Sequence, residues 1–102
     1  MCVGGWDPTT GAIPASFIEE LDLAFSNVEL NLKTAGGKGW SEVYKIVLYY
    51  VPDLGEDEFA ACVRNLTKWC PGHKPLLTGL GVCTLGLPGM RVEIEVVAHV
   101  QQ

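Results

Sequence analysis

The last segment of the chain alternates apolar and polar residues with a period of two. It follows the turn-forming pair Pro88-Gly89, and its apolar positions are Val92, Ile94, Val96, Ala98 and Val100. The residues between them are Arg91, Glu93, Glu95, Val97 and His99. This period is typical of a β-strand with one face in the core. The pattern predicts a closing strand whose second face, with two carboxylates, is either solvated or lines a site.

Two segments show helical periodicity. The first begins at the capping box Ser16-Phe17-Ile18-Glu19, where the Ser16 hydroxyl accepts a hydrogen bond from the N3 amide and Glu19 reaches back. Apolar residues then recur every three or four positions until Ala35-Gly36-Gly37, which predicts a helix over about 16–35. The second begins with the acids of Glu56-Asp57-Glu58, which suit a helix N-terminus. It predicts a helix over about 55–69 whose apolar positions are Phe59, Cys62, Val63, Leu66 and Trp69 or Cys70.

The remaining apolar segments predict strands. Residues 43–51 are apolar on both faces and end at Pro52-Asp53, as in a central strand covered on both sides. Residues 76–85 predict a glycine-containing strand with a bulge or a close backbone approach, and Cys2-Val3 predicts a short strand end. Two helices can cover only one face of such a sheet. We therefore expect another copy of the chain to cover the other face.

Length and composition indicate one domain, residues 1–102, with 48% hydrophobic residues. No apolar run approaches the ~20 residues that span a bilayer, and the N-terminus lacks the features of a signal peptide. We expect no membrane association and a cytoplasmic location, or a mitochondrial one if the N-terminus is incomplete. The net charge of −5 and seven scattered Lys and Arg residues disfavour nucleic-acid binding.

The four cysteines, Cys2, Cys62, Cys70 and Cys83, form no CxxC pair, and the two histidines complete no metal pattern. The sequence therefore indicates neither a metal nor a cofactor. We interpret the cysteines as free thiols that act as small hydrophobes. A redox or nucleophilic cysteine is the alternative, and the spacing does not support it.

Six short pieces in register resemble the YjgF/Rid family of reactive-intermediate deaminases, also labelled L-PSP endoribonuclease-like. The pieces are Gly5-Trp6-Asp7-Pro8-x-Thr10-Gly11, Ala24-Phe25-x-Asn27-Val28 with Ala35-Gly36, Val43-x-Lys45, Pro75, Gly81-Val82 and Val92-Glu93-Ile94-Glu95-x-x-Ala98. The resemblance implies a chorismate-mutase-like α+β fold, with a mixed sheet packed on two helices. It also implies a homotrimer with small-molecule clefts between subunits, and a chain that is short at its N-terminus.

The family's better-known activity is hydrolysis of reactive 2-imino or enamino acids to keto acids and ammonia. Its site uses an arginine as a fork for the substrate carboxylate and a glutamate on the last strand that handles water. The resemblance places the glutamate at Glu93. It places the arginine at Leu77, two residues after the Pro75 match, and leucine cannot bind a carboxylate.

Each candidate residue also has a structural interpretation. Glu93 is either the catalytic group or a solvated strand carboxylate, and Glu95 is interpreted as a surface or interface residue. Arg91 either replaces the lost arginine or, as we favour, neutralises Glu93. Thr78 and Asn65 either donate hydrogen bonds to a ligand or are an ordinary strand hydroxyl and helix-end amide. Trp6 either walls the cleft or packs its own turn.

Two functional hypotheses follow. The first is an imine or enamine deaminase in which Glu93 handles water. The second is a non-catalytic or repurposed family member that binds a neutral or apolar metabolite or biosynthetic intermediate, because the arginine position is Leu77. A literal ribonuclease is disfavoured by the acidic balance and by the lack of a basic patch.

Overall fold

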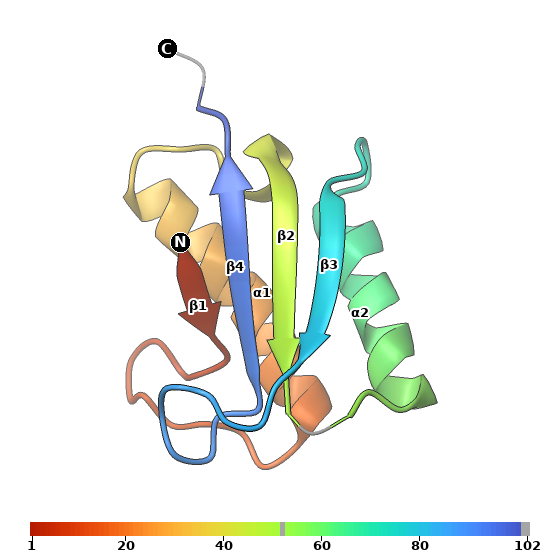
Figure 1. Cartoon of the computed structure of the whole chain (residues 1–102). Helices are drawn as coiled ribbons and strands as arrows, with labels where there is room; N and C mark the ends of the chain where they lie inside the picture. Colours follow the sequence, from red (N-terminus) through yellow and green to blue (C-terminus); the bar gives the residue numbers. More distant parts are fainter. Residues whose placement is uncertain (52, 101–102) are drawn as a thin grey trace.

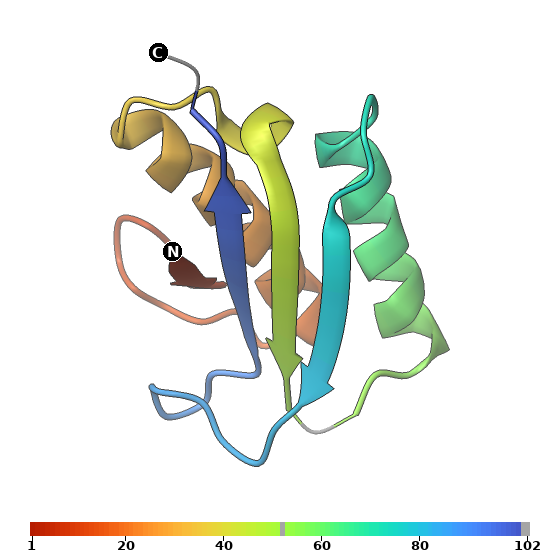
Figure 2. The ribbon, with the colours of Figure 1, turned by 45° about the horizontal axis from the view of Figure 1, so that its top comes forward.

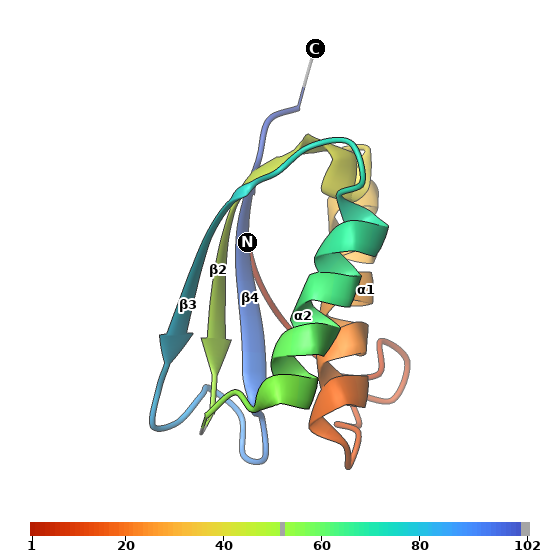
Figure 3. The same cartoon turned by 90° about the vertical axis from the view of Figure 1, so that its right-hand side faces the viewer.

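The computed structural model describes residues 1–51 and 53–100 and contains one mixed sheet with two α-helices on one face (Figure 1, Figure 3). The elements in chain order are β1 (Cys2–Gly4), α1 (Phe17–Thr34), the 3-10 helix η1 (Gly39–Glu42), β2 (Val43–Tyr50), α2 (Glu56–Trp69), β3 (Leu76–Gly81) and β4 (Val92–Ala98). This confirms the predicted α+β class and the predicted element order. Pro52, expected to close the central strand, lies outside the described residues.

The four strands lie in the order β1-β4-β2-β3 (Figure 1, Figure 2). Strand β4 is antiparallel to both β1 and β2, while β2 and β3 are parallel. The closing strand of the sequence is therefore an inner strand of the sheet, with β1 and β3 at the two edges.

Both helices match their predicted ranges closely. The Ser16 hydroxyl accepts a hydrogen bond from the Glu19 amide at 3.4 Å, which satisfies one of the free donors at the start of α1. The apolar face of α1 is buried as expected. The apolar stripe of α2 is buried only in part, because Phe59 is 62% exposed and Val63 is 47% exposed.

Two strand boundaries differ from the prediction. The third apolar segment forms a strand only to Gly81 and not to residue 85, because its partner β2 ends at Tyr50. Its pairing with β2 is continuous, and the register irregularity lies between Val43 and Lys45 where β2 pairs with β4. The closing strand ends at Ala98, so Val100 does not face the core and is 49% exposed.

The two faces of the sheet differ in what covers them. One face packs against α1 and α2, and its alternate strand residues enter the core; these are Val3, Ile46, Leu48, Val92, Ile94 and Val96. Figure 3 shows that both helices lie on this side. In residues 1–51 and 53–100 no helix covers the other side, which we call the open face. The second cover predicted for the central strand is thus not supplied by the described part of the chain.

Neither α-helix in the described segments is long and apolar enough to cross a membrane.

Candidate functional site

Glu93 lies on the open face of the sheet. Its neighbours Val92 and Ile94 are fully buried on the helix side, so the pleat turns Glu93 the other way. Glu93 pairs in register with Gly4 of β1 and with Tyr49 of β2. The alternation predicted for this strand is therefore confirmed from Val92 to Val96.

The second carboxylate of the strand, Glu95, is held by two neighbours. The Tyr49 hydroxyl donates a hydrogen bond to Glu95 Oε1 at 2.8 Å, and Cys2 Sγ lies 3.9 Å from the same oxygen. The hydrogen bond to Glu95 is the main reason that the pKa of Tyr49 is raised. Burial and then the negative charges of Glu93 and Glu95 raise the pKa of the Cys2 thiol. Both neighbours therefore stay protonated at neutral pH, and Glu95 Oε1 is already in contact with both of them.

Glu93, by contrast, makes no side-chain hydrogen bond or ion pair with the described residues. Its oxygens are free to accept protons from water or from a ligand. A carboxylate in this state can act as a general base when a substrate brings water within hydrogen-bond reach.

Trp6 lies beside this carboxylate and also packs its own turn. A Cβ added to Gly4 would collide with the Trp6 ring and with the Met90 side chain, so the ring covers the residue that pairs with Glu93. The buried Asn27 amide fixes this approach by donating to the carbonyl oxygens of Gly4 at 3.0 Å and Trp6 at 2.7 Å. The two interpretations of Trp6 are thus compatible.

The turn after Trp6 is held by Asp7. Its Oδ1 accepts hydrogen bonds from the amides of Thr9 at 2.8 Å and Thr10 at 3.0 Å. These bonds, that of Thr10 first, lower the pKa of Asp7. The turn keeps Trp6 beside β1.

Arg91 does not neutralise Glu93, and this prediction was wrong. Its Nε donates to Glu20 Oε1 of α1 at 2.8 Å, and its terminal nitrogens donate to the carbonyl oxygens of Ala15 at 3.0 Å and Pro14 at 2.7 Å. The strand begins only at Val92, so Arg91 precedes the regular alternation and turns toward the helix side. Each of its three guanidinium nitrogens donates a hydrogen bond there, on the opposite side of the sheet from Glu93.

The fully buried Glu20 carboxylate holds the start of β4. Besides the guanidinium, it accepts hydrogen bonds from the backbone amides of Arg91 at 2.7 Å and Val92 at 3.2 Å. The apolar pattern of α1 does not reveal this residue. The sequence feature that could have revealed Glu20 is its spacing from Ala24 and Asn27, which places two polar side chains on a buried helical face.

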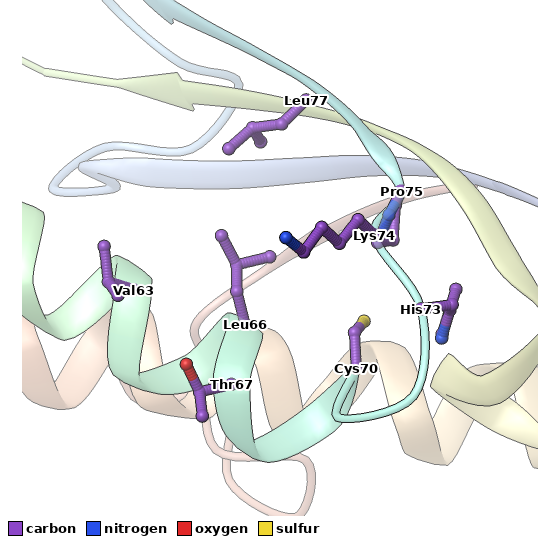
Figure 4. A pocket seen from close by; sticks show the side chains of 8 residues that line it. All are labelled: Val63, Leu66, Thr67, Cys70, His73, Lys74, Pro75 and Leu77. Atoms are coloured by element: carbon purple, nitrogen blue, oxygen red, sulfur yellow. The ribbon is translucent and has the colours of Figure 1, made fainter.

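Leu77 and Asn65 lie on the helix side of the sheet and not beside Glu93. Leu77 pairs with the buried Ile46 and points toward Val63 and Leu66 of α2 (Figure 4). Asn65 is buried between the helices and donates to Asp22 Oδ1 at 2.8 Å and to the Ala61 carbonyl at 2.9 Å. Its amide is therefore structural, and neither residue joins the Glu93 group within one subunit.

Thr78 lies on the open face, because it pairs with Val47, whose other partner is Glu95. It is exposed on the edge strand, two strands away from β4. The structure thus brings Glu93, Glu95, Tyr49, Cys2 and Trp6 together, with Thr78 on the same face.

The roles of Tyr49 and Cys2 were not anticipated from the sequence. Neither residue stands out in its own segment, because β2 is rich in aromatic residues and Cys2 lies in a short strand end. Only the pairing of β4 with both β1 and β2 brings them to Glu95.

The interpretation of the cysteines as small hydrophobes fits Cys62 and Cys70, which are buried, and is wrong for Cys2 and Cys83, which are exposed. Cys62 and Cys70 are free thiols within the core, and burial raises the pKa of Cys62 to about 11. Such a thiol is almost fully protonated at neutral pH and is a poor nucleophile. Among the residues that the structure describes, no three His, Cys, Asp or Glu side chains are grouped to hold a metal ion.

The strand order and the two helices on one face define an α+β protein of the YjgF/L-PSP fold. The family model described as Endoribonuclease L-PSP matches residues 2–100. The chain belongs to this family, which confirms the resemblance drawn from the sequence. A search of curated proteins finds no match.

Solved structures show the same fold at low sequence identity. A Rid-family protein of unknown function, YyfB from Yersinia pestis, is 19% identical with a TM-score of 0.83, covering 95% of this chain and 73% of that one. RidA from an Antarctic Psychrobacter species is 22% identical with a TM-score of 0.83, covering 98% and 77%. A hypothetical protein from Giardia lamblia is 20% identical with a TM-score of 0.78, also covering 98% and 77%. These similarities establish the fold and not the activity.

Proposed function

We propose that the chain forms a homotrimer with small-molecule clefts between subunits, bordered by the open face of the sheet. We also propose that it hydrolyses imines or enamines in these clefts, with Glu93 handling water. The observation that carries this proposal is the unengaged Glu93 carboxylate on the open face, beside Trp6 and Tyr49. The family membership and the match of Glu93 to the glutamate of the family motif support it.

The chemistry requires one proton acceptor at the attacking water. Glu93 takes one proton from the water as the water oxygen bonds to the imine carbon, and it passes this proton to the nitrogen. The carbon–nitrogen bond then breaks as the hydroxyl group of the adduct gives up its own proton. With both water protons transferred, the nitrogen leaves as ammonia and the carbonyl product remains. Positioned proton transfer of this kind contributes about 10²–10⁴-fold to a rate.

The open face itself supports assembly with other copies. Its apolar side chains have no cover within the described part of the chain; they include Val47, Leu76, Leu80 and Val97. Exposed apolar patches of this kind mark interaction surfaces. Light scattering of the purified chain should give three times the mass of one chain, and a monomer would contradict the proposed clefts.

The activity is tested by ammonia release from 2-aminoacrylate generated in situ. Glu93→Gln should lower the rate by about 10²–10⁴-fold, because glutamine keeps the shape but cannot accept the proton. Glu56→Gln, an exposed carboxylate at the start of α2, is the matched control and should leave the rate unchanged. A wild-type rate no higher than the rate without protein would refute the deaminase proposal.

A second candidate is binding of a neutral or apolar ligand without catalysis. Two positions were considered for binding a substrate carboxylate, and neither offers a free cation. Position 77 is leucine, and the Arg91 guanidinium donates its hydrogen bonds on the helix side. Calorimetry should then show that a neutral amide binds as tightly as the matching keto acid. Clear preference for the carboxylate would count against this candidate.

A further inference from the structure

The Glu93 carboxylate on the open face has an aromatic residue on each side. Its two partners in register are Gly4 of β1 and Tyr49 of β2, and the Trp6 ring covers Gly4. Trp6, Tyr49 and Glu93 are all half-buried. Aromatic rings beside a carboxylate suit an organic cation, because the face of a ring and the carboxylate both attract positive charge.

A second negative charge lies on the same face of β4. Glu95 is two residues after Glu93, ~6.5 Å along the strand, and the Tyr49 hydroxyl that donates to it carries no charge. Burial first, and then the charges of Glu93 and Glu95, raise the pKa of the Cys2 thiol. This order of causes fits a surface on which negative charge prevails.

The cations in or next to β1, β2 and β4 lie away from Glu93. Arg91 donates its hydrogen bonds on the helix side. Lys45, on the open face, is four residues from the position opposite Glu93, or ~13 Å along β2. The amino group of Met1 donates to the Val96 carbonyl oxygen at 3.3 Å, three residues or ~10 Å along β4 from Glu93. Both separations reach a Debye length at physiological salt, so the field at Glu93 is negative.

We propose that the Glu93 site is selective for small organic cations and, resting on the deaminase function proposed above, that its preferred substrates are protonated imines without a carboxylate. Glu93, Glu95 and the Trp6 ring would hold the positive group. A 2-imino acid would bring its own carboxylate into this negative field, where neither Leu77 nor Arg91 offers a compensating charge. Imines without a carboxylate form when a primary amine loses two hydrogen atoms to an oxidant. Amine oxidation is therefore the class of reaction that would supply the substrate.

Hydrolysis of such a cation needs only water as co-reactant. The water oxygen bonds to the imine carbon, and Glu93 takes one water proton and passes it to the nitrogen. The electron pair of the carbon–nitrogen bond then leaves with the nitrogen, and the hydroxyl proton is released. One protonated imine and one water give one aldehyde, one ammonia and one proton.

The selectivity is tested without catalysis by titrating ¹⁵N-labelled protein, in its native assembly, with three ligands of similar shape. These are 2-phenylethylammonium, 2-phenylethanol and 3-phenylpropanoate. The cation should shift amide signals of β1 and β4 in a saturable way. It should bind about two- to five-fold more tightly than the alcohol, the range for an exposed ion pair, and the anion should bind more weakly than the alcohol. The proposal is overturned if no shift saturates, or if the alcohol or the anion binds as tightly as the cation.

Two substitutions assign the selectivity to the site. Glu95→Gln should weaken the cation about two-fold, strengthen the anion and leave the alcohol unchanged, because it removes one negative charge. Glu56→Gln removes an exposed charge at the start of α2 and should change none of the three. Equal effects of the two substitutions would contradict the proposed site. If Glu95→Gln alters the fold, which its spectrum records, the comparison of the three ligands on the wild-type chain still decides.

The substrate preference is tested with two imines that differ only in the carboxylate. A flavin amine oxidase generates one from 2-phenylethylamine, and an amino-acid oxidase generates the other from phenylalanine. The chain should accelerate ammonia release from the first more than from the second, and the reverse order would overturn the preference. If it accelerates neither while the cation still binds more tightly than the alcohol, the deaminase function is refuted and the cation site stands.

Discussion

The two faces of the sheet use the same strands for opposite purposes. On the helix side β4 contributes Val92, Ile94 and Val96 to the core, and even the acid there, Glu20, has all its hydrogen bonds within the protein. On the open face the same strand presents Glu93, whose carboxylate has no partner among the described residues. The comparison shows that burial alone does not mark a functional group. A buried acid that accepts three hydrogen bonds within the protein is structural, while an acid that accepts none from the described residues is available for chemistry.

The largest expected difference between the faces is in packing. Ile94→Ala should lower the free energy of unfolding by about 2–5 kcal/mol, because it leaves a cavity beside α1. Val97→Ala, three residues later on the open face, should change it by less than about 0.5 kcal/mol in the isolated chain. Urea unfolding of both variants measures the difference. Equal effects would mean that the open face is packed as tightly as the core.

Substitution of the acid on the helix side, Glu20, should also cost more stability than substitution of the acid on the open face, Glu93. Glu20→Ala should cost about 3 kcal/mol, the lower end of the range for breaking a buried pair, because the Arg91 side chain is 31% exposed and can reach water. Glu93→Ala should change stability by less than about 0.5 kcal/mol, since no described group depends on it. Thermal and urea unfolding check both. A large loss of stability in Glu93→Ala would assign it a structural role.

The smallest expected effect is a change in the pKa of Tyr49, which should depend more on Glu95 than on Glu93. Glu95 raises the pKa of Tyr49 chiefly by accepting its hydrogen bond, which favours the protonated phenol. In Glu95→Gln the pKa of Tyr49 should therefore fall, so that the phenolate forms at lower pH than in the wild type. Absorbance titration near 295 nm measures it, with Tyr49→Phe identifying the signal among the three tyrosines. Glu93→Gln is the matched control and should have the smaller effect.

The local patterns of the sequence predict the elements well and the site only in part. The alternation of β4 places Glu93 correctly, because a period of two assigns each residue to a face. It fails at Arg91, where the strand has not yet begun and the partner Glu20 lies 71 residues away. Such a long-range pair leaves no trace in the local pattern.

The positions of Leu77 and Asn65 could not be predicted for a related reason. The face on which Leu77 lies depends on its register with Ile46, and a motif match carries no register. Asn65 is placed by the packing of α2 on α1, where Asp22 accepts its hydrogen bond. The prediction treated each residue within its own element, whereas both are positioned by a neighbouring element.

The position of β4 has a consequence for how the chain folds. This strand comes last in the sequence, yet it joins β1 to β2, and its pairing of Glu95 with Cys2 spans nearly the whole described chain. During synthesis, β1 therefore has no partner among the described strands until β4 has left the ribosome. Closing so long a loop delays folding, because the entropy is lost before the contacts form. The sheet is thus completed only when β4 is available, and until then the apolar residues of β2 and α1 lack their central partner.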